Sequence, residues 1–374
     1  HQQVAPFHHL SAGMGSLCSC CCDDFDLEET VVEKAQPQVV THRLQDFVEC
    51  RDTVGGHARF LEPKDHVTVM AFRNGQVCKV TGNVILKLAA HNEQAFFEAL
   101  EYACEALKPF VPTYYGVANV CTNSGALQEY LVLEHVGCSN PAACDIKMGY
   151  VQRASHHDSQ KWVSMRQKAA SSTSMEFGFR PCGLSYYDWQ KQKRVKETKK
   201  AGRQVKGHEL VAAFGKYFNQ DRGQRWPLQG PWKAIVLKSI ATIDELQGIV
   251  KELNGVRFWG ASLLFMLDTE AIYSQDARRI EESFAMKFID FSNSVFLGDG
   301  PDTEIISSLE NLKSMLRAML QKQSLTDPSF ETCRPDLSVQ DAEQRLAMNS
   351  YARTKTYGYG SPPSPSPIRR RMGS

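Results

Sequence analysis

The sequence shows no excess of charge of either sign. Lys and Arg number 43 against 42 Asp and Glu, which leaves a formal net charge of +1. Without a global positive field the chain has no general attraction for nucleic acid, so any anion site must be a local cluster of Lys and Arg. We therefore expect no nucleic-acid partner.

Long hydrophobic runs are missing as well. No stretch of about 18 uncharged apolar residues occurs, which disfavours a membrane-spanning helix, and the N-terminal residues lack the apolar core of a secretory signal. Four of the twelve cysteines lie within residues 18–22, and the other eight show no Cys-x-x-Cys spacing. This usage disfavours a disulfide framework or a zinc site and predicts a reduced, cytoplasmic chain, with the nucleus as an alternative compartment.

Composition divides the chain into four parts. Residues 1–40 mix Gly, Ser, Cys and acidic residues without periodicity, and residues 326–374 form a basic tail rich in Pro and Ser. Neither part can bury a core, so both are predicted to be disordered. Between them, residues 41–136 predict a small lobe of strands around one helix, and residues 137–325 predict a larger lobe of strands and helices.

Periodicity and turn residues place the individual elements. Asn92 is the expected N-cap of the first helix. The apolar face of that helix is expected to consist of Ala95, Phe96, Ala99, Leu100 and Ala103. Further helices are expected at 161–170, 209–219, 232–253 and 304–320, and the first at 92–107. Strands are expected at 67–72, 84–86, 114–120, 130–133, around 144, and at 177–187, 262–267 and 285–291.

The segment most informative about chemistry is Pro141-Ala-Ala-Cys-Asp145-Ile-Lys147-Met-Gly149. Residues two apart on a strand point to the same side, so Asp145 and Lys147 would share a face. The acid could accept hydrogen bonds from sugar hydroxyls, and the lysine could neutralise phosphate charge. By chemistry alone, a solvated strand face is the alternative explanation.

This segment matches, in all nine positions, the Pro-x-x-x-Asp-x-Lys-x-Gly pattern of the inositol polyphosphate kinase superfamily. The chain resembles that superfamily from residue 54 to residue 320, because four more segments fit in the right order: 54–57, 133–136, 262–264 and 289–291. Its details resemble the hexakisphosphate kinases most closely, at 93–98, 165–168, 172–174, 179–183, 202–203, 299–302 and 309–312. No His-Arg-Asp or Asp-Phe-Gly occurs, which disfavours a protein kinase.

The resemblance implies an α+β, two-lobed kinase-like fold, with an antiparallel-sheet N-lobe, a larger mixed C-lobe and ATP in the cleft. Lys87, at the end of an apolar strand, should reach the ATP phosphates. Lys79 is the alternative for this role because it also ends a strand, but the spacing from Lys87 to Phe96 favours Lys87. Glu93 would steady Lys87, or would serve only the dipole of its helix.

The remaining nucleotide contacts are also implied by the resemblance. Glu134 and Val136 should bind adenine through backbone groups, and Asp145 should take the ribose hydroxyls. Lys147 should face the transferred phosphate and the inositol phosphate. Asp290 should hold Mg²⁺ against the ATP phosphates, since this hard cation prefers carboxylate oxygen. We expect Asp290 to be buried after an apolar strand, where it would need a charge partner.

A substrate crowded with phosphates needs several cations near Lys147. The candidates are Arg153, Lys161, Arg166 and Lys168, with a solvated face as the alternative. Residues 191–206 hold eight basic residues and one acid, which indicates a mobile loop, an anion collector or a solubility feature.

The preferred acceptor is predicted to be inositol hexakisphosphate, in a monomeric enzyme. Many relatives have His where this chain has Asn293, and asparagine cannot take a proton at neutral pH. An acceptor that is itself a phosphate needs no general base, whereas a multikinase or trisphosphate kinase acts on a free hydroxyl. A membrane-tethered inositide-binding scaffold with little turnover is a third hypothesis.

The N-terminal part carries a candidate acylation pattern. Met14-Gly-Ser-Leu-Cys-Ser19 fits N-myristoylation of Gly15 if translation begins at Met14, and Cys18 and Cys20 would then be palmitoylation sites. Two acyl chains would hold the protein at a membrane surface, whereas one holds only marginally. The alternative is an unmodified low-complexity leader.

Overall fold

The computed structural model describes residues 41–50, 60–137, 141–150, 159–223, 226–296, 300–321 and 333, all within the compact unit Val39–Ser374. The leader predicted to be disordered, and the tail apart from Cys333, lie outside these residues. So do Gly15, Cys18 and Cys20, the glycine-histidine element at 54–57, and Arg153. The predictions made for them, and the division into lobes at residue 136, stay predictions.

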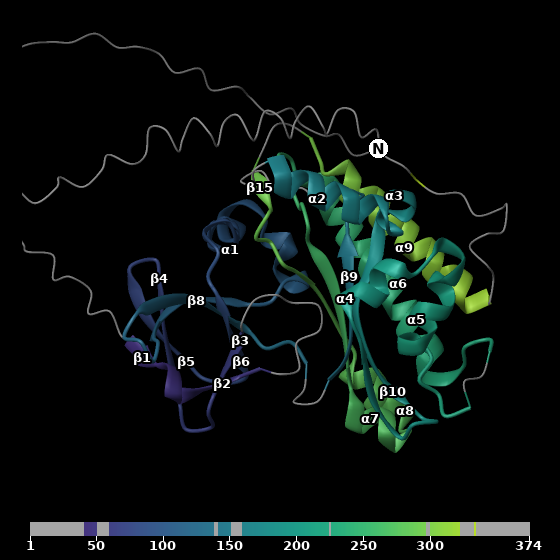
Figure 1. Ribbon diagram of the computed structural model, residues 1–374, viewed down its shortest axis with the longest axis horizontal. Helices are drawn as coiled ribbons and strands as arrows, with labels where there is room; N and C mark the ends of the chain where they lie inside the picture. Colours follow the sequence, from purple (N-terminus) through teal and green to yellow (C-terminus); the bar gives the residue numbers. More distant parts are fainter. Residues whose placement is uncertain are drawn as a thin grey trace, which may run out of the picture. The chain divides into compact units, whose positions relative to one another are not determined.

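Eight strands from the first part of the described chain form one sheet (Figure 1). They are β1 (Thr41–Arg43), β2 (Phe47–Glu49), β3 (Phe60–Pro63), β4 (Val69–Arg73), β5 (Gln76–Val80), β6 (Val84–Leu88), β7 (Tyr114–Cys121) and β8 (Leu127–Glu134). The strand order is β2-β3-β6-β8-β7-β4-β5, with β1 added in parallel to β7 and the other described pairs antiparallel. A hydrophobic core with residues from β2 through β8 fills one face of this sheet. Leu86 belongs to that core, so the next residue, Lys87, points to the opposite face.

The helix between β6 and β7, α1 (His91–Ala103), differs from the prediction at its start and on its buried face. Its N-cap is Ala90, without a side-chain cap, rather than Asn92. Phe96 and Leu100 are buried as predicted, but Ala95 is exposed, and Glu93 and Phe97 are buried in addition. Both aromatic rings are accommodated because they contact different partners, Phe96 stacking on a ring after β14 and Phe97 on one in β7. The helix ends at Ala103, and the 3-10 turn η2 (Glu105–Phe110) follows it.

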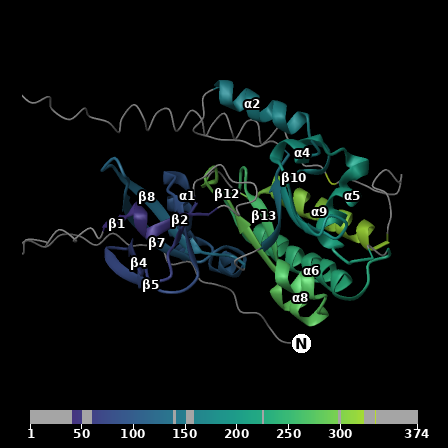
Figure 2. The ribbon, with the colours of Figure 1, turned by 60° about the horizontal axis from the view of Figure 1, so that its bottom comes forward.

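A second, five-stranded antiparallel sheet has the order β11-β10-β9-β13-β14. Its strands are β9 (Pro141–Met148), β10 (Phe179–Asp188), β11 (Lys193–Glu197), β13 (Ser262–Asp268) and β14 (Ala285–Ile289). The helices α5 (Leu210–Phe218), α6 (Gly230–Glu252) and α9 (Thr303–Gln321) pack on one side of it (Figure 1, Figure 2). Because helices cover that face, the alternate residues of β9 there are apolar: Cys144, Ile146 and Met148 belong to the large core.

The other elements are short apart from α2. They are η1 (Leu44–Asp46), α2 (Ser159–Ala170), α3 (Ser174–Phe177), α4 (Lys199–Gln204), η3 (Gly207–Glu209), β12 (Val256–Arg257), α7 (Thr269–Ser274), α8 (Ala277–Ser283) and β15 (Val295–Phe296). The expected strands and long helices are present, with small shifts at their ends. None of the helices in the described ranges combines the length and the apolar character that crossing a membrane requires.

The basic segment 191–206 is not the loop that was one of its three interpretations. It contains β11, which pairs with β10 over five residues, and α4, whose N-cap Thr198 accepts a hydrogen bond from the backbone of Ala201. Its charges are therefore held by secondary structure. At Gly202 the helix lies so close to β10 that an added Cβ would be 2.3 Å from the carbonyl oxygen of Pro181.

We expect Gly202→Ala to destabilise the protein by about 1–3 kcal/mol, because the backbones of α4 and β10 would have to separate. The matched control is Gly248→Ala in α6, where an added Cβ meets nothing within 4 Å. That substitution should stabilise by about 0.5–1 kcal/mol through helix propensity. Urea unfolding of both variants measures the difference, and equal effects would show that α4 does not pack as closely as described.

Candidate functional site

The strand β9 brings Asp145 and Lys147 onto one face, as their spacing predicts. Across the sheet, Lys147 lies opposite Arg180 of β10 and Ser262 of β13. Residues directly opposite on neighbouring strands share a face, so these polar groups form one row on the side away from the large core. Asp145 is only 5% exposed.

Asp290 joins this row from the end of β14. The strand pairs Ile289 with Ser262, and the chain then leaves the sheet at Asp290 with a left-handed backbone (φ 72°). This turn aims its carboxylate at two lysines: Oδ2 lies 2.9 Å from Nζ of Lys147, and Oδ1 lies 3.0 Å from Nζ of Lys87. The expectation of a buried aspartate is wrong, because this side chain is 40% exposed.

Lys87 is held from a second side by Glu93. The Glu93 carboxylate lies 2.8 Å from Nζ of Lys87 and also accepts a hydrogen bond from the backbone N–H of Phe291. Glu93 is 1% exposed, so it links β6, α1 and the turn after β14 rather than serving only its helix dipole. Lys79 lies exposed on β5 at the end of the strand order. The structure therefore places Lys87, and not Lys79, among these groups.

The electrostatics of this cluster keep the bridging groups ionised. Burial alone would lower the pKa of Lys87, but the carboxylates of Glu93 and Asp290 outweigh it and raise that pKa. Burial also opposes ionisation of Asp290, yet the charges of Lys147 and Lys87 hold the pKa of Asp290 well below its ordinary value. Asp145 behaves differently, because burial raises its pKa to about 6 despite the opposing charge of Lys147.

Residues 130–317 of this chain match the family model for inositol polyphosphate kinase. That match spans half of the 374 residues and includes Asp145, Lys147 and Asp290. The chain belongs to the inositol polyphosphate kinase family.

Individual relatives agree with this assignment. An uncharacterized inositol polyphosphate kinase from Schizosaccharomyces pombe is 29% identical over 186 residues, which are 47% of this chain and 19% of that protein. Inositol hexakisphosphate kinase 3 from Mus musculus is 25% identical over 209 residues, 50% of each protein. The chain thus spans half or less of the length of these curated relatives.

A solved structure supports the fold. The inositol phosphate multikinase Ipk2 from S. cerevisiae, in complex with ADP and Mn²⁺, is similar to this chain with a TM-score of 0.52 and 25% identity. The likeness covers 64% of this chain and all of that one. The predicted α+β, kinase-like fold is thereby confirmed.

In this family member, the segment expected to contact adenine follows β8. The Glu134 carboxylate accepts hydrogen bonds from the backbone N–H and hydroxyl of Thr113 and lies 3.3 Å from Nζ of Lys287. Burial opposes its ionisation, but these hydrogen bonds and Lys287 lower the pKa of Glu134 below its ordinary value. The carboxylate of Glu134 is thus occupied by contacts within the protein, so any contact between this residue and adenine must come from its backbone groups. Val136, the other residue expected to contact adenine, is half-buried.

Three of the cations expected to bind the substrate lie on α2. The helix carries Lys161, Arg166 and Lys168, and the guanidinium of Arg166 lies 4.7 Å from the ring of Trp162 on the same helix. Their role in substrate binding stays a prediction.

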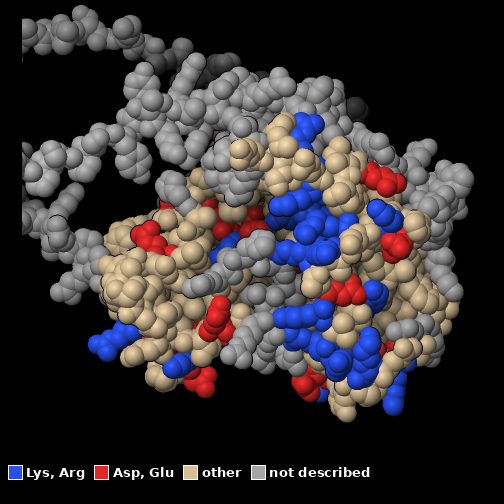
Figure 3. Space-filling model, viewed as in Figure 1, with Lys and Arg blue, Asp and Glu red and all other residues tan. Residues whose placement is uncertain are grey.

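The structure indicates another candidate for substrate binding, Lys199 of α4, which the sequence pattern did not single out. Partial burial lowers the pKa of Lys199. The positive charge of Lys199 attracts the carboxylate of Asp145 and is repelled by the ammonium group of Lys147. Lys and Arg side chains gather on the face seen in Figure 3, in the region where Figure 1 labels α4 and β10. The excess of basic residues at 191–206 was the available indication, but only the packing of α4 on β10 shows which of them approach Lys147.

Asn293 lies close to this group. A Cβ added at Gly260 would be 3.2 Å from the side-chain nitrogen of Asn293 and 3.9 Å from Cε of Lys147. Both side chains therefore border the same glycine. The position at which many relatives have His is thus beside the lysine of the family pattern in space, and it presents an amide.

Proposed function

We propose that this chain transfers the γ-phosphoryl group of ATP to a soluble inositol polyphosphate, with inositol hexakisphosphate as the preferred acceptor. The observation that carries the proposal is the single carboxylate of Asp290 between the ammonium groups of Lys87 and Lys147, at 3.0 and 2.9 Å. Two cations from different sheets, with an ionised acid between them, suit a reaction that joins two highly negative phosphates.

The residues present fit ATP with magnesium. Asp290 is ionised, partly exposed and offers the hard oxygen that Mg²⁺ takes from one or two carboxylates together with phosphates. When bound, the cation would neutralise charge on the ATP phosphates. Lys87 would bind those phosphates, Asp145 would accept hydrogen bonds from the ribose hydroxyls, and Lys147 would bind the phosphoryl group that is transferred.

The acceptor is inferred from Asn293. Its amide, beside Gly260 and Lys147, can orient a phosphate by hydrogen bonding but cannot remove a proton. A phosphate acceptor needs no such removal, so positioning and charge neutralisation suffice. The similarity to hexakisphosphate kinases points the same way.

One alternative has its own support. The likeness to a yeast inositol phosphate multikinase favours phosphorylation of a free hydroxyl on a less phosphorylated inositol. In that case a group able to take the hydroxyl proton must lie near the acceptor.

The deciding experiment incubates the purified chain with labelled ATP, Mg²⁺ and a panel of inositol phosphates, and resolves the products by charge. We expect hexakisphosphate to be converted to a diphosphoinositol product. Consumption of a trisphosphate with hexakisphosphate untouched would replace the preferred acceptor by the alternative. Binding of inositol phosphates without any turnover would favour the scaffold hypothesis.

The position of α4 makes a prediction about substrate affinity. Lys199→Ala should raise the KM for the inositol phosphate by about tenfold or more, since it removes a charge-assisted hydrogen bond, and leave the KM for ATP nearly unchanged. Lys200→Ala is the matched control, because the next residue on a helix faces another direction and Lys200 is exposed. Steady-state kinetics with each substrate varied in turn would test this, and equal effects of the two substitutions would contradict it.

A further inference from the structure

Three potential metal ligands meet apart from Lys87, Lys147 and Asp290. Cys50 follows β2, Glu62 lies on β3, and His135 follows β8. One ligand atom from each lies within 4.8 Å of the other two. Backbone hydrogen bonds hold this arrangement, from the N–H of Cys50 to Phe60 and from the N–H of His135 to Asn83.

The imidazole of His135 is the unsatisfied member of this group. Its side chain is 13% exposed, and Nε2 lies 3.6 Å from Oε1 of Glu62, which is too long for a hydrogen bond. Nδ1 is buried and has no hydrogen-bond partner among the described residues. A nearly buried ring without a hydrogen bond is costly, and in folded proteins an ion or an ordered water often satisfies such a group.

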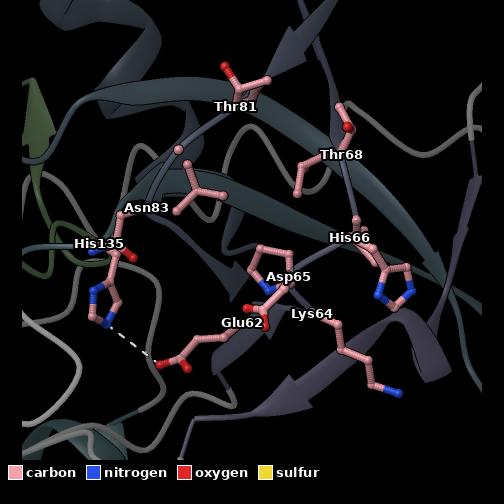
Figure 4. A pocket seen from close by; sticks show the side chains of 14 residues that line it. Glu62, Lys64, Asp65, His66, Thr68, Thr81, Asn83 and His135 are labelled. Carbon is pink, nitrogen blue, oxygen red and sulfur yellow. Dashed lines mark ion pairs between the residues drawn. The ribbon is translucent and has the colours of Figure 1, made fainter.

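The cluster borders a cavity of about 600 Å³. Figure 4 shows the ring of His135 and the carboxylate of Glu62 turned toward one another at its edge. The cavity lies between the β3–β4 connection and the β5–β6 turn of the first sheet, where Val69, Val80 and Val84 contribute to its lining. Glu62 and His135 line this cavity, which gives solvent a path to these two ligands.

We propose that Cys50, Glu62 and His135 bind a divalent transition-metal ion of the zinc class. A thiolate, an imidazole and a carboxylate are the donors that Zn²⁺ takes, whereas Mg²⁺ and Ca²⁺ prefer oxygen alone. Three protein ligands leave the fourth tetrahedral position to a water molecule from the cavity. Binding releases the thiol proton of Cys50 to solvent as the metal–sulfur bond forms.

The proposed ion would connect parts of the first sheet that are distant in sequence. It would tie the β2–β3 pair to the segment immediately after β8, between Glu134 and Val136. The cysteine spacing could not have predicted this site, because only one cysteine takes part, while Glu62 lies on β3 and His135 follows β8. The donor set shares no residue with Asp290, Lys87 and Lys147, so the two sites can be tested separately.

Cobalt(II) is the probe for this site, since a thiolate ligand gives Co²⁺ a near-ultraviolet charge-transfer band. The titration uses the full chain with Cys18, Cys20, Cys21 and Cys22 replaced by serine, which removes the competing cysteine cluster. We expect one Co²⁺ per chain with a thiolate band that Zn²⁺ abolishes. Cys50→Ala should remove the band, whereas Cys78→Ala, the matched control at another half-buried cysteine, should keep it.

The other two ligands are tested by affinity. His135→Gln and Glu62→Gln should each weaken Co²⁺ binding by at least about tenfold, with circular dichroism showing that both remain folded. Asp290→Asn should leave the band unchanged, which separates this site from the proposed magnesium site. Absence of a thiolate band, or a band that survives Cys50→Ala, would overturn the proposal.

Discussion

Replacing Asp290 with alanine is expected to lower kcat by about a thousandfold or more, while the protein stays folded. The carboxylate is the only described group that contacts both Lys87 and Lys147, so its loss removes the proposed magnesium ligand and leaves two ammonium groups without their shared counter-charge. Lys147 is only 14% exposed and loses the ion pair with Asp290, so the free energy of unfolding should fall by about 3 kcal/mol. Turnover of labelled ATP and a urea unfolding curve measure the two quantities.

Asp65→Ala is the matched control, because Asp65 is an exposed aspartate that lies away from the kinase cluster. It should leave both kcat and stability near those of the parent protein. Asp290→Asn adds a sharper comparison, since it keeps the shape of the side chain and removes only its charge. Retention of more than a small fraction of turnover in Asp290→Asn would contradict the role given to this carboxylate.

Replacing Lys87 with methionine should damage stability and activity together. Glu93 is 1% exposed and loses its cationic partner, and an uncompensated buried charge typically costs about 3–5 kcal/mol. The same substitution removes the cation expected to bind the ATP phosphates, so turnover should fall by about a hundredfold or more. Denaturant unfolding and initial rates at saturating inositol phosphate would report the two effects.

A double variant separates these two effects. Lys87→Met with Glu93→Gln removes the buried charge and should recover most of the lost stability, because the glutamine oxygen can still accept from the N–H of Phe291. It should not recover turnover. Lys79→Met, at the exposed rival lysine, is the control and should change stability by no more than about 0.5 kcal/mol. Recovery of activity in the double variant would mean that Lys87 serves only the fold.

Local sequence pattern was a good guide to the elements and to part of the site. The alternation in β9 correctly placed Asp145 and Lys147 on one face, because side chains on a strand alternate whatever surrounds it. The N-cap of α1 was wrong, and its buried face was right only in part. Phe96 is buried as predicted, but the adjacent Phe97 also has a ring partner and is buried. Periodicity could not show that Phe97 rather than Ala95 would be buried.

Basic residues were harder to assign. The excess of Lys and Arg at 191–206 was visible in the composition, but composition does not distinguish a loop from a strand and a helix. Lys199 is a candidate for substrate binding because of the tertiary structure: β11 pairs with β10, and Gly202 allows α4 to lie close to Pro181. The role of the α2 cations, which the family resemblance suggested, stays a prediction.

By itself the sequence determined the family, the long helices and many of the strands, because these follow from local periodicity and from motifs that resemble the family. The same resemblance supplied Lys87, Asp145, Lys147 and Asp290 as candidate site residues. Tertiary structure alone decided that Asp290 bridges two lysines from different sheets, that Glu93 is the buried partner of Lys87, and that Cys50, Glu62 and His135 meet. Asp290 is far along the chain from both of its lysines, as His135 is from Cys50, and such groups interact only after strand pairing has placed them a few ångströms apart. No pattern along the chain encodes that distance, which is why these contacts had to come from the fold.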